Sequence, residues 1–295
     1  MSVFEHKYFG NPQDICDNPH SRNCIYCKEK LSTVPIENAS WKTTDEELLT
    51  VHEETRIQYK EIHNLEDCYL NLNLDSKDEE VWIDYCTTCG WWRLVKDVCV
   101  WAETWQIWDI FFGCSGVLKN LQVDDLNTPI DEIANYLTAR YNSRFSVHPR
   151  LFEAVVGSVC KAMGYQVHVT GYTNDGGIDV VLENSSMGSI GIQVKRYKNK
   201  IRVEQIRAFA GALLLSGHKR GIFVTTSDFQ PGAYLAAGRY SIQTIPIELI
   251  NAERFYDALK LTQKPTVDTS VIIESAQNTL NILFPYGCDT PRNSL

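Results

Sequence analysis

Regular spacing of apolar residues begins near residue 148 and continues to about residue 260. Helices are expected where apolar residues recur every three or four positions, and strands where short apolar runs lie between turn-forming residues. The expected helices cover 149–163, 203–215, 231–239 and 252–259, and the expected strands cover 165–170, 178–182, 190–195, 221–226 and 245–250. This order predicts a mixed sheet flanked by helices, which is an α/β architecture.

The region before residue 148 has few periodic segments, but the sequence around residue 128 is typical of a helix start. Thr128 is expected as the N-cap, Pro129 as the first helical residue and Asp131 as the acid that follows. The predicted organisation is an acidic, Trp-rich domain over 1–122, a linker helix within 123–146, an α/β domain over 147–262 and a tail over 263–295. Within the tail, 271–283 is ambiguous and is one further candidate helix.

The net charge of −9 is unevenly distributed along the chain. Residues 1–149 hold 13 Lys and Arg against 25 Asp and Glu, whereas residues 150–260 hold 13 against 9. Because contacts with phosphate dominate DNA affinity, only the second region suits a polyanion. No apolar run approaches the roughly 20 residues that span a bilayer, and the N-terminus lacks the pattern of a secretory signal. A cytoplasmic protein without membrane contact is therefore expected.

Three polar residues sit at the ends of two neighbouring predicted strands. Asp179 follows the glycine-rich turn 173–177, and Gln193 and Lys195 end the strand 190–195. Because side chains alternate along a strand, Gln193 and Lys195 share one face, and a hairpin would bring Asp179 beside them. Such a group suits phosphodiester hydrolysis, in which oxygen ligands hold Mg²⁺ and a cation favours the attacking hydroxide. Each residue alone also fits a turn end or an exposed strand face.

Residues 147–260 resemble the Mrr-type branch of the PD-(D/E)xK nuclease superfamily. The resemblance rests on Phe152-Glu153, Gly164-Tyr165, Asp175-Gly-Gly-Ile-Asp179, Gln193-Val-Lys195-Arg-Tyr and Gly221-Ile-Phe-Val-Thr-Thr-Ser227. It implies that Asp179 and Gln193 bind Mg²⁺ or Mn²⁺, that Lys195 is the catalytic lysine, and that Glu153 supplements the metal site. Gln193 stands where the superfamily pattern has an acid, as is usual in this branch, and it lowers the charge of the site.

The residues after Lys195 are rich in cations, and only Glu204 interrupts them. A phosphate-contacting role is favoured over a solvated face for Arg196, Lys198, Lys200, Arg202 and Arg207. Hydroxyls at the end of the next strand suit a phosphate contact and a turn cap equally, and they belong to Thr225, Thr226 and Ser227. For His148, capping or packing is favoured over a role in the site.

Two Cys-x-x-Cys pairs predict a structural zinc site in the N-terminal domain. They are formed by Cys24 with Cys27 and by Cys86 with Cys89. Four thiolates make a closed tetrahedral site, although the 58 residues between the pairs exceed the usual insertion in a zinc ribbon. Cys16, His20 or Cys99 are alternative ligands. Cys68, Cys114, Cys160 and Cys288 are interpreted as small buried apolar residues, as are Cys16 and Cys99 if they bind no metal.

Six of the seven tryptophans lie between residues 82 and 108. In so acidic a region, a role in the core or at a partner interface is favoured over stacking on bases. A further hypothesis is that this domain senses a protein, a modified base or a small ligand and controls the second domain.

The sequence as a whole is interpreted as a Mg²⁺-dependent endodeoxyribonuclease, with a role in restriction or antiviral defence implied by the resemblance. Cutting both strands of a duplex requires two sites, so a homodimer or higher oligomer is expected. The alternatives are a catalytically silent DNA-binding or regulatory module, and a zinc-domain adaptor that delivers the nuclease to a protein partner.

Overall fold

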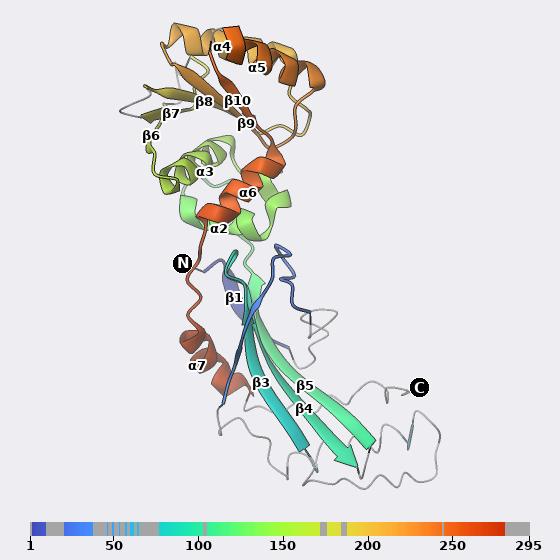
Figure 1. Ribbon diagram of the computed structural model, residues 1–295. Helices are drawn as coiled ribbons and strands as arrows, with labels where there is room; N and C mark the ends of the chain where they lie inside the picture. Colours follow the sequence, from blue (N-terminus) through green and yellow to red (C-terminus); the bar gives the residue numbers. More distant parts are fainter. Residues whose placement is uncertain are drawn as a thin grey trace. The chain divides into compact units, whose positions relative to one another are not determined.

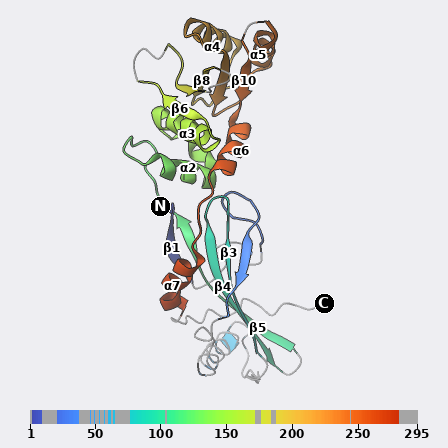
Figure 2. The ribbon, with the colours of Figure 1, turned by 60° about the vertical axis from the view of Figure 1, so that its left-hand side comes forward.

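The computed structural model describes residues 2–9, 21–37, 77–102, 105–171, 176–183, 188–243 and 245–280, with a few positions between 46 and 64. The chain divides into two units (Figures 1 and 2). We call Phe4–Val117 with Thr266–Leu295 the cysteine unit, and Met1–Val3 with Leu118–Pro265 the α/β unit. Within the described part of the chain, no helix combines the length and apolar character that crossing a membrane requires.

The cysteine unit is built on a five-stranded sheet. Its strands are β1 (Phe4–Phe9), β2 (Ser32–Pro35), β3 (Lys77–Tyr85), β4 (Trp92–Ala102) and β5 (Trp105–Leu118). They lie in the order β1-β5-β4-β3-β2, and β2 to β5 pair antiparallel. The helix α7 (Thr269–Leu280) also belongs to this unit.

These long strands lie in a region whose sequence has few clear periodic segments. Strand prediction relies on apolar residues at every second position, and here buried positions hold charge. Asp84 and Arg93 are 4% and 1% exposed and form an ion pair of 2.7 Å. Lys96, which is 4% exposed, pairs with Glu79 at 2.7 Å. Each of these buried charges has an oppositely charged partner on the neighbouring strand. The residue pattern along a single strand cannot reveal such partners.

The α/β unit confirms the predicted fold class. Its elements are α2 (Ile130–Ala139), the 3₁₀ helix η3 (Tyr141–Phe145), α3 (Pro149–Ala162), β6 (Gln166–Val169), β7 (Val180–Glu183), β8 (Ile190–Lys195), α4 (Val203–Leu215), β9 (Arg220–Thr225), α5 (Pro231–Gln243), β10 (Ile247–Ile250) and α6 (Ala252–Thr262). The sheet order is β10-β9-β8-β7-β6, with β6, β7 and β8 antiparallel and β8, β9 and β10 parallel.

Helices cover both faces of this sheet. In Figures 1 and 2, α4 and α5 lie on one face, and α2, α3 and α6 lie on the other. On the first face, Phe209 of α4 packs in one core cluster with Phe223 of β9 and Ala233 of α5. On the second, the rings of Phe152 and Phe255 are 5.3 Å apart and join α3 to α6. The sheet is therefore packed against helices on both faces.

The helix expected after residue 128 begins one residue later than predicted. α2 starts at Ile130, Pro129 precedes it as the cap, and no side-chain hydrogen bond caps the helix. The Thr128 hydroxyl instead donates to the Gln122 carbonyl at 2.8 Å. The hydroxyl that was expected to cap the helix is therefore hydrogen-bonded to the preceding turn.

Candidate active site

The hairpin of β7 and β8 brings Asp179, Gln193 and Lys195 to one place. The two strands pair antiparallel with Val180 opposite Ile192, and Asp179 lies immediately before β7. The backbone N–H of Asp179 donates to the Ile192 carbonyl at 2.8 Å, which extends the pairing by one residue. Gln193 and Lys195 are the next residues of β8 that share a face.

The Asp179 carboxylate is fixed in a nearly dry position. The residue is 7% exposed, and its Oδ2 accepts a 2.6 Å hydrogen bond from the backbone N–H of Val194. Val194 lies between Gln193 and Lys195 on β8, so this hydrogen bond holds the Asp179 carboxylate close to both candidate residues. On the other side, the Thr170 hydroxyl donates to the carbonyls of Ile178 and Asp179 at 2.8 and 3.0 Å.

The turn before Asp179 depends on two glycines. Gly176 and Gly177 have φ values of +57° and +85°, a region that residues with a side chain rarely adopt. A Cβ on Gly177 would lie 3.4 Å from Nε2 of Gln193, so the turn passes close to the Gln193 amide. Gln193 itself is 9% exposed. The glycine pair therefore allows the chain to pass this amide and enter β7.

Glu153 is linked to this group through Arg150. Both residues are on α3, and their side chains form an ion pair of 2.8 Å. A second nitrogen of the Arg150 guanidinium donates to the Thr170 carbonyl, and Thr170 in turn bonds the carbonyl of Asp179. The structure therefore places Glu153 beside the hairpin, one ion pair and two hydrogen bonds from Asp179.

The five candidate phosphate-binding cations differ in their surroundings. Lys198, Arg202 and Arg207 are exposed. Arg196 is turned inward and donates to the Phe145 carbonyl. Lys200 forms an ion pair of 2.9 Å with Asp228, and this contact, together with hydrogen bonds from the Phe229 backbone, Tyr234 and Asn251, lowers the pKa of Asp228 from 3.8 to about 2.

The hydroxyls at the end of β9 bind protein backbone. Thr225, Thr226 and Ser227 donate to the carbonyls of Lys195, Tyr197 and Lys198 at 3.0, 2.9 and 3.0 Å. They therefore tie the chain that follows β8 to the neighbouring strand. His148 also has the structural role that was favoured for it, because Nδ1 accepts from the N–H of Arg150 at the start of α3.

Arg144 is a cation that the sequence analysis did not single out. Its guanidinium donates to the Thr226 carbonyl at 3.0 Å and lies 4.2 Å from the centre of the Phe145 ring. Lys198 Nζ is 5.9 Å from the same ring. The contacts with Thr226 and Lys198 join residues far apart in sequence, and only the pairing of a basic residue with aromatic neighbours at 141–145 could have indicated them.

The four cysteines of the two Cys-x-x-Cys pairs form one buried cluster. Their Sγ atoms all lie within 4.8 Å of one another, with Cys24 and Cys89 at 3.6 Å and Cys27 and Cys86 at 3.4 Å. In a tetrahedral site with Zn–S bonds of about 2.3 Å, sulfur atoms are about 3.8 Å apart, so the donor set fits one such ion. Hydrogen bonding with Cys24 raises the pKa of Cys89 and lowers that of Cys86.

The other cysteines and tryptophans are only partly described. Cys114 is buried and Cys160 is partly buried, whereas Cys16, His20, Cys68, Cys288 and the side chain of Cys99 lie outside the described residues. Trp91 and Trp92 are 0% and 7% exposed, in agreement with a core role. The Trp91 indole donates to the Gly116 carbonyl at 2.8 Å. The side chains of Trp101, Trp105 and Trp108 also lie outside the described part.

Residues 145–259, within the α/β unit, are similar in sequence to restriction endonucleases. Residues 145–259 match the sequence model of the Mrr_cat family, described as restriction endonuclease. The type IV methyl-directed restriction enzyme EcoKMrr of Escherichia coli (strain K12) is 39% identical over 90 residues, which cover 28% of this chain and 30% of that protein. Among solved structures, the DNA modification-dependent restriction endonuclease AspBHI aligns with a TM-score of 0.34 and 18% identity, over 56% of this chain and 43% of that one. The chain thus spans less than half of either relative.

Proposed function

Because residues 145–259 match the sequence model of the Mrr_cat restriction endonuclease family, we propose that this protein is a metal-dependent endodeoxyribonuclease. The observation that carries the proposal is the hydrogen bond between the Asp179 carboxylate and the Val194 N–H, at 2.6 Å. It fixes an acid beside Gln193 and Lys195 at one end of the hairpin. An acid, an amide oxygen and an ammonium group held together in this way suit hydrolysis of a phosphodiester.

Each site residue has a separate role in the proposed hydrolysis. Asp179 and Gln193 are the proposed ligands of Mg²⁺ or Mn²⁺, which when bound supplies a Lewis acid for the scissile phosphate. The Lys195 ammonium orients the attacking water and offsets negative charge that develops on the phosphate. Glu153 is the additional acid. Its Oε2 is held 2.8 Å from Arg150, and its second oxygen is the one proposed for the site.

DNA would lie against the basic segment that follows Lys195. Lys198, Arg202 and Arg207 are exposed and suit contacts with phosphate oxygens. Lys200 pairs with Asp228, so phosphate would compete with that carboxylate. Arg196 supports this segment through its bond to the Phe145 carbonyl. Binding through these charges would weaken steeply as salt rises.

The proposed biological role is restriction of foreign DNA that carries methyl groups. This role follows from the name of the relative from Escherichia coli, which is called methyl-directed. Cleavage of both strands requires two sites, so a homodimer or larger assembly is part of the proposal. The cysteine cluster is proposed to hold one structural Zn²⁺, because four thiolates leave no open position for chemistry.

The test is cleavage of plasmid DNA by the purified chain. Methylated and unmethylated plasmids are incubated with Mg²⁺, with Mn²⁺ and with no added divalent ion, so that no chelator disturbs the cysteine cluster. The proposal predicts cutting that needs the added ion and prefers methylated DNA. DNA that is bound in all three conditions and cut in none would instead support the silent DNA-binding module.

A further inference from the structure

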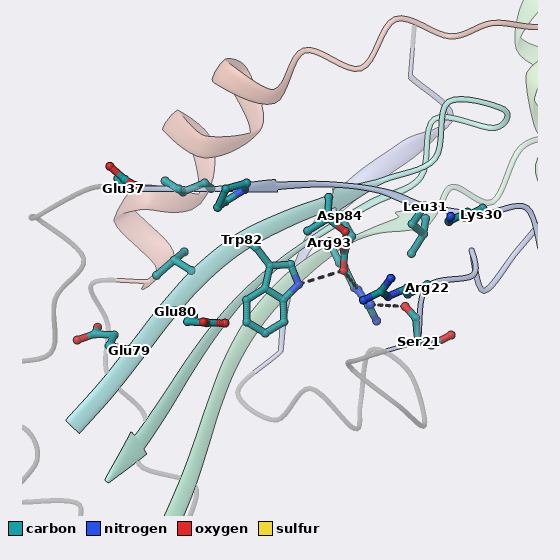
Figure 3. A pocket seen from close by; sticks show the side chains of 14 residues that line it. Ser21, Arg22, Lys30, Leu31, Glu37, Glu79, Glu80, Trp82, Asp84 and Arg93 are labelled. Atoms are coloured by element: carbon teal, nitrogen blue, oxygen red, sulfur yellow. Dashed lines mark hydrogen bonds and ion pairs between the residues drawn. The ribbon is translucent and has the colours of Figure 1, made fainter. Parts of the chain in front are cut away.

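The cysteine unit contains a pocket that the proposed nuclease does not use. Its volume is about 630 Å³, within the range of small-molecule sites. Every lining residue belongs to the segment 21–37 or to β3 and β4. Figure 3 shows these side chains gathered over the sheet. Because the lining is confined to one unit, its chemistry can be examined without reference to the α/β unit.

The floor of the pocket is a row of polar residues across three strands. Thr33, Asp84 and Arg93 are direct partners in the register of β2, β3 and β4. The Arg93 Nε donates to Asp84 Oδ2 at 2.7 Å, and the Thr33 hydroxyl donates to the same carboxylate. Trp82, two residues from Asp84 and thus on the same face, donates from its indole to Asp84 Oδ2 at 3.1 Å. This network fixes the orientation of an aromatic ring inside the pocket.

Charges of opposite sign line the two ends of the pocket. Figure 3 shows Glu37, Glu79 and Glu80 on one side of the Trp82 ring, and Arg22 and Lys30 on the other. Glu79 pairs with Lys96, whereas Glu80 is exposed. Arg22 and Lys30 are exposed and have no ion-pair partner among the residues that the structure describes. A fitting ligand therefore combines an anionic end, a flat body and a hydrogen-bond donor at the opposite end.

We propose that this pocket binds a nucleotide. Arg22 and Lys30 would hold the phosphate, because guanidinium and ammonium groups are the usual phosphate partners. The base would stack on Trp82, since every base presents a flat π face. Glu80 would accept a hydrogen bond from the exocyclic amino group of adenine, cytosine or guanine. The nucleotide is either free in solution or an unpaired nucleotide of a DNA strand, and both present the same chemistry.

Calorimetric titration of the full-length, zinc-loaded chain without Mg²⁺ tests this proposal. The probes are dCMP, TMP, deoxycytidine, inorganic phosphate and a short single-stranded oligodeoxynucleotide. The variants Arg22→Gln and Glu80→Gln change one exposed side chain at each end, so the fold is retained. Arg239→Gln, an exposed residue of α5 outside the pocket, is the matched control.

The expected result is that dCMP binds more tightly than either deoxycytidine or phosphate alone. Arg22→Gln and Glu80→Gln should each weaken dCMP about tenfold, as expected for a lost charge-assisted hydrogen bond. TMP presents a carbonyl oxygen where dCMP presents its exocyclic amino group, so Glu80→Gln should not weaken TMP binding. If the oligonucleotide binds in an Arg22-dependent way and dCMP does not bind, the nucleotide in the pocket is part of a DNA strand, and the proposed site is supported. Absence of Arg22-dependent binding to any probe, or phosphate binding as tightly as dCMP, would overturn the proposal.

Discussion

At the scale of single residues, the candidate site depends on hydrogen bonds that connect distant parts of the sequence. The Asp179 carboxylate accepts a hydrogen bond from the Val194 N–H. The Thr170 hydroxyl donates to the Asp179 carbonyl, and the Thr170 carbonyl accepts a hydrogen bond from Arg150. The side chains with a proposed catalytic role are therefore held in place by residues that have no proposed role in catalysis. Two predictions concern individual side chains in and beside this network.

Lys195→Met should lower the rate of DNA cleavage by about 10²–10³-fold, the usual effect of losing one group that stabilises transition-state charge. DNA affinity should change little, because other cations supply most phosphate contacts. Single-turnover cleavage and equilibrium binding of the same DNA measure the two effects. Lys219→Met removes an exposed lysine just before β9 and serves as the control. Equal rates for the two variants would exclude the proposed role of Lys195.

Asp228 should stabilise the fold in a pH-dependent way. Its pKa is lowered from 3.8 to about 2, chiefly by Lys200, so the stabilisation is present above pH 4 and is lost as the pH falls towards 2. Because the pair is partly exposed, its contribution is about 0.2–1 kcal/mol. Urea unfolding should show wild type more stable than Asp228→Asn at pH 6 and nearly equal to it close to about pH 2. A constant difference would argue against the Lys200 contact.

The sequence indicated that Asp179, Gln193 and Lys195 lie close together, but it did not indicate the residues that support them. Asp179, Gln193 and Lys195 lie at strand ends of a short hairpin, so local pattern was enough to bring them together. Arg150, Thr170 and Arg144 are linked to the site by backbone carbonyls of other elements. A carbonyl exists at every position of a chain, and no sequence pattern marks which one a side chain will reach.

At the scale of elements, two glycines let α4 approach the sheet. Gly191 and Gly221 are direct partners on β8 and β9. A Cβ on Gly221 would lie 2.3 Å from Leu213 Cδ1 and 2.8 Å from the Phe209 ring, both on α4. The absence of side chains at this pair makes room for α4, which packs against the sheet next to β8. The close approach therefore helps to hold the strand that carries Gln193 and Lys195.

Gly221→Ala should destabilise the protein by about 1–3 kcal/mol, because the added methyl group overpacks a buried contact. Gly238→Ala is the matched control: a Cβ on Gly238 of α5 meets nothing within 4 Å. That change should stabilise by about 0.5–1 kcal/mol, since alanine favours the helix. Urea unfolding followed by far-ultraviolet circular dichroism compares the two. The packing account would be wrong if Gly221→Ala were as stable as Gly238→Ala.

Element prediction succeeded where one face of a helix or a short buried strand carries a simple pattern. In the α/β unit every expected helix and strand is present. In the cysteine unit, β3, β4 and β5 were not anticipated, because Asp84, Arg93 and Lys96 occupy buried positions on β3 and β4. The alternation of Glu80, Trp82 and Asp84 with the apolar Val81 and Ile83 was a signal of a strand.

At the scale of the whole molecule, the chain combines two units with different sources of stability. The α/β unit has apolar cores on both faces of its sheet, whereas the cysteine unit has four clustered thiols and buried ion pairs. All seven tryptophans lie between residues 41 and 108. Intrinsic tryptophan fluorescence therefore reports on the cysteine unit alone.

Cys86→Ser should remove one bound zinc ion per chain and lower the temperature at which tryptophan fluorescence changes. The reason is that the free energy of metal binding contributes directly to the stability of such a unit. Atomic emission gives the zinc content, and a thermal scan of fluorescence gives the stability. Cys114→Ser alters a buried cysteine outside the cluster and should keep the zinc. Full zinc content in Cys86→Ser would rule out the four-cysteine site.

The central claim is that Asp179 belongs to the catalytic site, and cleavage by Asp179→Asn tests it most directly. Asparagine keeps the size of the side chain and an oxygen for the Val194 N–H, so the hairpin should persist. Glu183→Gln neutralises an exposed acid at the other end of β7 and is the control. On DNA that the wild type cuts with Mg²⁺, the account predicts a loss of about 10²-fold or more for Asp179→Asn and none for Glu183→Gln. Cleavage by Asp179→Asn at the wild-type rate would contradict it.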